Sequence, residues 1–230
     1  MRKKLILAGV LLVLAVAAVW GGSVIYANVQ NSRASSEFTL TPQSPETGGP
    51  SAGATASLGP EGLNGTWKVA AGSQAGYRVD EVLNGQNATV VGRTSGVQGE
   101  VTIDGTSLTS AKVVVDMNGL VTDSDSRDRQ FTSIVKTLDF PTSTFTLTEP
   151  VDISAVATGT ASVTAKGELT IAGATQAVTA SLQAQATAGG VQVSGSIPIT
   201  FSDFGIDAPN LGFVKVENSG TVEMLLELAK

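Results

Sequence analysis

The chain contains neither cysteine nor histidine. Without cysteine there are no disulfides, thiolate metal sites or cysteine nucleophiles. Without histidine the chain lacks the most common general base near neutral pH and the most common metal ligand. Imidazole triads and zinc sites built on imidazole are therefore excluded. We expect no catalytic residues, no metal site, no cofactor and no enzymatic activity.

Aromatic residues make up 5% of the 230 residues and charged residues 15%, whereas hydrophobic residues make up 42% and glycine occurs 26 times. Such a chain can build a core, and its many small and β-branched residues are typical of short strands joined by tight turns. The net charge is −6. An acidic surface repels a phosphate backbone, so we expect no nucleic-acid partner.

No charged residue occurs between positions 5 and 27, a run of mostly Leu, Ile, Val and Ala that follows Arg2, Lys3 and Lys4. Its length suffices to span a bilayer core of about 30 Å, and the basic cluster predicts that everything after it lies outside the cytoplasm. Residues 1–30 are thus predicted to be a single-pass transmembrane helix that anchors the protein in the cytoplasmic membrane. A cleaved signal peptide followed by secretion is the alternative, although the run exceeds the usual apolar region of about 7–15 residues.

Residues 31–65 are rich in Ser, Gly, Pro, Ala and Thr. A segment of this composition buries too little apolar area to offset its ordering entropy. We therefore predict a disordered linker, which would span on the order of 30–35 Å.

From residue 66 to 230 apolar residues recur with a period of two, which predicts β-strands. Val97, Gly99, Val101 and Ile103 form one such series. Hairpin or bulge signals separate the series at positions 84–85, 104–105, 188–190 and 218–220. Sequential antiparallel strands are therefore expected.

One helix is predicted within residues 123–138. Asp and Ser residues near position 124 are good N-caps, apolar residues then follow at helical spacing, and Pro141 is expected to prevent continuation. About eight antiparallel strands, one short helix and glycines inside the strands favour an all-β barrel. A two-sheet sandwich remains the structural alternative.

Three sequence clusters in this region carry a family resemblance. The first runs from Arg127-Asp128 to the Leu138–Phe145 stretch LDFPTSTF, the second is GELTIAGATQAVT at positions 167–179, and the third is Asp203-Phe204-Gly205-Ile206 followed by Pro209. Together they resemble the YceI-like family of polyisoprenoid-binding proteins. The chain departs from the family pattern where family members often carry histidines, because Ser73-Gln74-Ala75 and Ala172 stand at those places.

The resemblance implies a lipocalin-like barrel whose interior is an apolar tunnel for a polyisoprenoid, an isoprenoid quinone or a similar amphiphilic lipid. Such a protein would sequester or carry its ligand without making or breaking bonds. We expect the tunnel to be lined by Tyr77, Val113, Val115, Phe131, Phe140, Phe145 and Phe204. The sequence leaves the oligomeric state open.

Arg127 and Asp128 are candidates for contact with the ligand's head group, because Arg suits bidentate contact with phosphate. The competing interpretation is a salt bridge that holds the helix to the barrel. Asp80 and Glu81 are neighbours on a predicted strand and should point to opposite faces, so they are not expected to act together.

Two other functions are compatible with the sequence. One is a cell-surface interaction or stress-response module whose barrel is filled by its own side chains and binds no lipid. The other is an enzyme, which would need carboxylate, Lys or Tyr chemistry for which no spacing in the sequence gives support.

Overall fold

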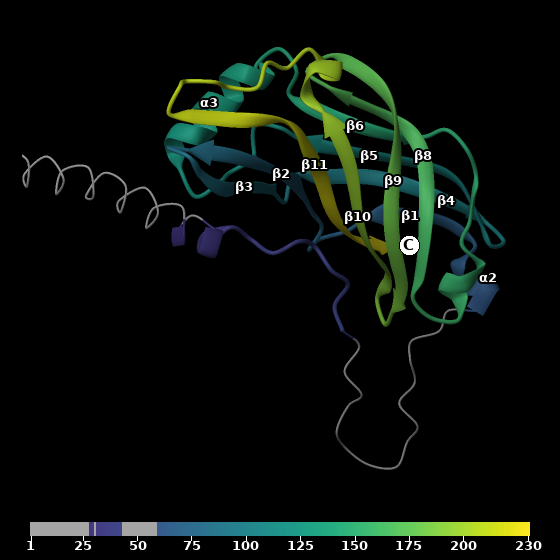
Figure 1. Ribbon diagram of the computed structural model, residues 1–230. Helices are drawn as coiled ribbons and strands as arrows, with labels where there is room; N and C mark the ends of the chain where they lie inside the picture. The colour runs from purple at the N-terminus through teal and green to yellow at the C-terminus, as the bar shows by residue number, and fades with distance from the viewer. Residues whose placement is uncertain (1–27, 30, 43–58) are drawn as a thin grey trace, which may run out of the picture.

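The computed structural model describes residues 28–29, 31–42 and 59–230. Antiparallel strands make up most of it (Figure 1). Their bounds are β1 Gly65–Val69, β2 Gln74–Leu83, β3 Gln86–Thr94, β4 Val97–Asp104, β5 Ser107–Asp116, β6 Thr142–Leu147, β7 Val151–Asp152, β8 Ala161–Ile171, β9 Ala174–Thr187, β10 Gly190–Thr200 and β11 Val214–Ala229.

Eight strands close into a ring in the order β1, β4, β5, β6, β8, β9, β10, β11. The ring closes because Lys68 and Val69 of β1 pair with Ala229 and Leu228 of β11. Strands β2 and β3 lie outside this ring and lengthen one wall, since β2 pairs with the first part of β11 and β3 pairs with β2. The predicted antiparallel barrel of about eight strands is confirmed, and the two-sheet sandwich is excluded.

The turn signals are confirmed as hairpins or as a bulge. Asn84 and Gly85 join β2 to β3 with positive φ angles of 49° and 79°, as a two-residue hairpin turn requires. Ala172 and Gly173 join β8 to β9 in the same way, with φ angles of 51° and 81°. The signal at positions 218–220 marks a shift in register inside β11.

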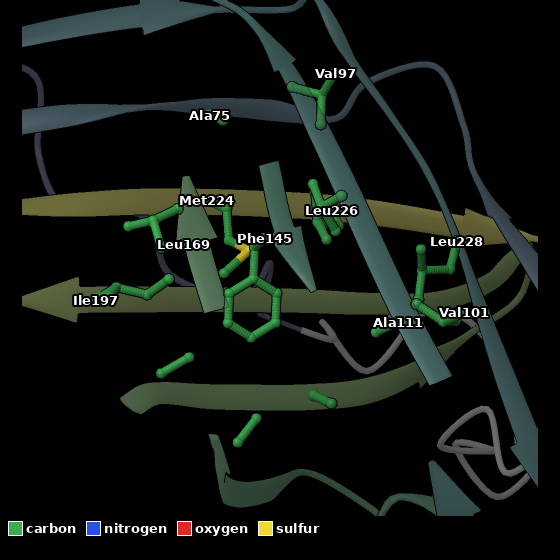
Figure 2. Packing of buried hydrophobic residues seen from close by; sticks show 14 of the residues in the cluster. Ala75, Val97, Val101, Ala111, Phe145, Leu169, Ile197, Met224, Leu226 and Leu228 are labelled. Atoms are coloured by element: carbon green, nitrogen blue, oxygen red, sulfur yellow. The ribbon is translucent and has the colours of Figure 1, made fainter. Parts of the chain in front are cut away.

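One end of the barrel, which we call the packed end, is filled by side chains (Figure 2). Phe145 lies opposite Val113 on one side and Leu169 on the other, and all three side chains are buried. Helix α2 (Gly59–Leu63) closes this end: Leu63 is fully buried, and its carbonyl accepts a hydrogen bond of 2.8 Å from Trp67 Nε1. The barrel domain therefore begins at α2, inside the range predicted to be linker.

The predicted helix is α3 (Asp125–Val135), which lies over the opposite end of the barrel. Ser124 is its N-cap, and Asp125 and Asp128 lie in its first turn, where carboxylates interact favourably with the helix dipole. The helix ends before Leu138, within the predicted range. Lys136 ends it by adopting the left-handed conformation with φ 56°.

Two 3₁₀ turns complete the domain, η1 (Ser154–Ala157) and η2 (Phe201–Phe204). The second follows β10 directly, and Gly205 ends it with φ 67°. The sequence around Phe204 is thus a turn that leaves the wall. The loop from Gly205 to Phe213 then leads back to β11.

Residues 31–42, which we call the strap, lie against the outer wall of the barrel, drawn in purple in Figure 1. Asn31 exchanges two hydrogen bonds with β3, at Asn87 O and Thr89 N. Farther along, Thr41 bonds to the side chains of Gln185 on β9 and Gln192 on β10. The prediction of a disordered linker therefore does not hold for residues 31–42 or 59–65, and residues 43–58 lie outside the described range.

No helix among the residues that the structure describes has the length and apolarity needed to cross a membrane. The apolar run at positions 5–27 lies outside the described residues. The membrane anchor expected there stays a prediction.

Candidate functional site

The end of the barrel opposite α2 contains a cavity of about 670 Å³. We call this the open end. Its walls come from β2, β3, β5, β11, α3 and the loop before β11, with single residues from β6, β8 and the end of β10. Most of the lining side chains are apolar, among them Val79, Val90, Val115, Met117, Phe131, Ile134, Ile199, Ile206, Leu211, Phe213 and Val222.

Helix α3 provides the lid-like wall of the cavity. Phe131, Ile134 and Val135 recur at helical spacing and all three line the cavity. The ring of Phe131 stacks on the ring of Tyr77 from β2, with centroids 5.1 Å apart and planes 5° apart. Gly92 on β3 leaves room for the Tyr77 ring, because a Cβ atom at that position would overlap it.

Three polar groups converge at the cavity beneath the start of α3. Tyr77, Glu81 and Arg127 all line it. Arg127 Nη1 lies 2.6 Å from Asp123 Oδ1, and Arg127 Nη2 lies 3.6 Å from Glu81 Oε1. The Arg127 guanidinium is therefore shared by the carboxylates of Asp123 and Glu81. With both carboxylates ionised, these three side chains carry more negative than positive charge.

Burial controls the ionisation of these groups. It raises the pKa of Glu81 above the usual range, and the nearby Arg127 guanidinium offsets part of that rise. Burial also raises the pKa of the Tyr77 hydroxyl, again with a smaller opposing effect from Arg127. The Tyr77 hydroxyl, which is protonated at neutral pH as in any tyrosine, is a hydrogen-bond donor on a residue that lines the cavity.

Several of the predicted tunnel residues reach the cavity. Tyr77, Val115 and Phe131 line it. Val113, Phe145 and Phe204 are buried in the hydrophobic core and are not among the lining residues of the cavity. Their predicted contact with a ligand is not supported by their positions in the structure and stays a prediction.

Phe140 lies on the outside of the cavity wall. Its ring packs on Gly173 in the β8–β9 hairpin, where a side chain would collide with it, and the residue is 36% exposed. The physical reason is the end of α3 at Val135, five residues earlier, which takes the following chain across the hairpin. Phe140 is absent from the cavity lining.

Arg127 and Asp128, the two residues predicted to contact a head group, occupy different positions relative to the cavity. Arg127 lines the cavity, whereas Asp128 does not. Asp128 Oδ1 accepts hydrogen bonds from the Thr122 backbone N–H at 2.9 Å and from its hydroxyl at 2.7 Å. Asp128 thus fixes the segment that leads into α3.

Two parts of the cavity wall were not predicted from the sequence. They are Glu81 and the loop from Gly205 to Phe213, which we call the rim loop. Glu81 was correctly predicted to face away from Asp80, whose carboxylate bonds to Thr89 on the outside, but its inward side was not recognised as a cavity wall. Leu211 and Phe213 belong to a loop without strand periodicity, so no pattern placed them at the cavity. The only signal was their proximity to Pro209 in the third cluster.

Comparison with known proteins supports this architecture. The family described as the YceI-like domain matches residues 67–228. The chain belongs to the YceI-like family. This match covers every strand of the barrel from Trp67 onward, and it confirms the resemblance that the three sequence clusters indicated.

Solved structures of YceI-like and related domains share the fold. A polyisoprenoid binding domain from Saccharophagus degradans, implicated in plant cell wall breakdown, has a TM-score of 0.57 and 19% identity over 72% of this chain and 98% of that one. BcnA of Burkholderia cenocepacia has a TM-score of 0.50 and 18% identity over 67% of this chain and 96% of that one. The comparison with curated proteins gives no match.

Proposed function

We propose that this protein is an extracytoplasmic, membrane-tethered binding protein that holds the chain of an amphiphilic lipid in the open end of its barrel. The observation that carries the proposal is the apolar cavity of about 670 Å³, a size within the range of about 300–1,000 Å³ typical of small-molecule sites. The similar domain from Saccharophagus degradans is a polyisoprenoid binding domain, which points to the same ligand class.

Burial of the ligand supplies the affinity. A lipid segment that loses roughly 300 Å² of apolar surface to the cavity gains about 7.5 kcal/mol at about 25 cal/mol per Å², before the costs of association. No bond needs to be made or broken, so the cycle is reversible. The alternative of an interaction module with a filled barrel is disfavoured because only the packed end is filled.

The polar groups favour a neutral head group. Arg127 is already paired with Asp123 and lies near Glu81, so a phosphate entering the cavity would face two carboxylates around one guanidinium. Like charges at short range in a partly buried site are unfavourable. An isoprenoid alcohol or quinone instead offers oxygen atoms to the Tyr77 hydroxyl and the Arg127 guanidinium without adding charge.

The first experiment measures bound lipid. The full chain is purified, extracted with organic solvent and analysed by mass spectrometry, and the emptied protein is titrated with an isoprenoid quinone. We expect a co-purifying lipid and saturable binding. Absence of both a native lipid and added-quinone binding would overturn the proposal.

A matched pair of variants locates the binding site. Val115→Trp fills the cavity from β5, whereas Val114→Trp makes the same change on the outer face of the same strand. We expect Val115→Trp to reduce binding of the quinone at least about tenfold, which is the effect of losing about 1.4 kcal/mol of contact. Val114→Trp should bind as the unmodified protein does. Circular dichroism checks that both variants fold.

The head-group selectivity has its own test. Binding is compared for a prenyl phosphate, a prenol and an isoprenoid quinone of equal chain length. We expect the phosphate to bind most weakly, and Glu81→Gln to reduce the difference because it removes one of the two carboxylates. Tighter binding of the phosphate than of the quinone would contradict this selectivity while leaving the lipid site intact.

A further inference from the structure

Apolar side chains are exposed at the rim of the cavity. Leu211 and Phe213 line the cavity, yet they are 57% and 58% exposed. The rim loop is fixed in place, since the Phe213 carbonyl accepts a hydrogen bond of 2.8 Å from Asn84 N in the β2–β3 turn. Large apolar side chains held in water beside a binding site indicate a contact surface.

The strap has a definite direction along the barrel. It begins at the open end, where Asn31 bonds to β3 only a few residues from the β2–β3 turn. It then passes Arg78 and Arg93, whose guanidinium groups donate to the carbonyls of Ser35 and Ser36. The contact at Asn31 therefore places the start of the strap at the open end of the barrel.

The strap is held by buried polar partners. Arg93 lies 3.6 Å from the centre of the Phe38 ring, a cation–π contact. Both Arg93 and Arg78 are ion-paired to Glu223, which is 3% exposed. Near the packed end, Thr41 N donates a hydrogen bond of 2.7 Å to Gln192 Oε1, and Gln192 is itself buried. These contacts make the strap part of the folded domain.

The distance between the apolar run and the strap is short. The run ends at Ala27 and the first strap contact is at Asn31, so four residue steps separate them and span at most about 14 Å. A bilayer's head-group region extends about 5–8 Å beyond its hydrocarbon core. A barrel held at Asn31 would therefore lie against the surface of the membrane that the run enters.

We propose that the strap holds the barrel with its open end against the lipid bilayer, with Leu211 and Phe213 inserted into the bilayer interface. A lipid would then pass between membrane and cavity without crossing water. This inference rests on the proposed function, from which it takes the membrane tether and the lipid ligand. The disordered linker predicted from the sequence would leave the orientation of the barrel free, whereas the strap would fix it.

The test measures how close each end of the barrel lies to lipid. The chain has no cysteine, so Leu211→Cys at the rim and Ala188→Cys at the exposed β9–β10 hairpin of the packed end each take a single bimane label. The full chain is inserted into vesicles of phosphatidylethanolamine and phosphatidylglycerol, with and without brominated acyl chains. We expect bromine to quench the label several-fold more strongly at position 211 than at position 188.

Two further variants test the role of the strap. A flexible Gly/Ser insertion of about 20 residues between Ala27 and Asn28 adds reach of about 25 Å and leaves the strap intact. Combined Asn31→Ala, Phe38→Ala and Thr41→Ala weakens the hold of the strap, because it removes the two Asn31 side-chain bonds to β3, the Phe38 ring on Arg93 and the Thr41 hydroxyl bond to Gln192, and it leaves the barrel sequence unchanged. We expect each variant to lower quenching at position 211 towards the level at position 188. This drop would also exclude quenching by a lipid bound inside the cavity, which neither variant would change.

The outcomes separate the two proposals. Equal quenching at both positions, or unchanged quenching at position 211 in the insertion variant, overturns the fixed orientation. Lipid extraction from the same samples tests the carrier function: bound lipid with equal quenching leaves that function standing, whereas unequal quenching with an empty cavity supports docking and overturns the carrier. Failure of the full chain to float with the vesicles overturns both.

Discussion

The packed end and the open end of the barrel share strands such as β5, which has the same alternation along its length, yet one end is solid and the other hollow. On β5, Val113 lies in the packed core and is 6% exposed, whereas Val115, two residues farther on the same face, lines the cavity. Opposite Val113 stands Phe145, and opposite Val115 stands Ser143. The size of the facing side chain, rather than the pattern, decides which part of the barrel is filled.

The wall itself also differs between the two ends. At the packed end, β1 pairs with both β4 and β11 and closes the ring. At the open end, β2 and β3 extend beyond the ring. There α3 forms part of the cavity wall through its side chains, without backbone hydrogen bonds of the kind that join strands. A helix wall leaves space that a closing strand would fill.

The largest effect is expected from removing the aromatic ring at the centre of the packed end. Phe145→Ala leaves a void beneath Gly167, which contacts the ring directly. Such a substitution costs about 3–5 kcal/mol of unfolding free energy. Urea denaturation followed by circular dichroism measures this loss.

The control is Phe131→Ala, which removes the same ring from the cavity wall. Phe131 is only partly buried and faces a space that already exists, so we expect a smaller loss of stability together with weaker lipid binding. Equal destabilisation by the two substitutions would show that the open end is packed as tightly as the other.

A finer comparison uses two valines of one strand. Val113→Ala should cost about 2 kcal/mol, because it removes about two methylene equivalents from a filled core and leaves a void. Val115→Ala should cost less, since it only enlarges the existing cavity, and its main effect should be on lipid affinity. Thermal or urea unfolding and a quinone titration measure the two effects. A larger stability loss at Val115 than at Val113 would reverse the assignment of packed and open ends.

Much of the fold could be predicted from the sequence because strands, hairpins and helix caps are local. The alternation at Val97–Ile103, the two-residue turn at Asn84-Gly85 and the start of α3 after Ser124 each depend on neighbouring residues. The cavity is not local. Tyr77 and Phe131 stack from elements far apart in the chain, so no pattern near either residue could show that they line a hollow.

The strap could not be predicted for a related reason. Its composition of small polar residues is that of a free linker. What orders it is a set of outward-facing partners far along the chain, including Arg78, Gln185 and Gln192. Strand alternation shows only which face a residue takes and not what covers that face, so it gives no sign that the strap lies on these side chains.

The smallest effect concerns the one buried carboxylate at the cavity, which distinguishes the open end electrostatically. Burial raises the pKa of Glu81, against the opposing influence of Arg127, and Asp123 adds to the rise. The folded state thus keeps the Glu81 proton to a higher pH than the unfolded chain does.

The contribution of Glu81 to stability is fully present below its unfolded pKa, about 4.3, and is lost as the pH rises through the folded pKa. Glu81→Gln cannot lose a proton, so the unfolding free energy of the unmodified protein should fall relative to that of the variant as the pH rises above about 4.3. Urea denaturation at a series of pH values measures the difference. Glu149→Gln is the matched control, because it makes the same substitution at an exposed carboxylate, which pairs with the equally exposed Lys166, and the Glu81→Gln curve is compared with it. A flat curve for Glu81→Gln, or one of opposite slope, would show that Glu81 is as well solvated or as well paired as a surface carboxylate, and the open end would then have no charge preference to impose on a head group.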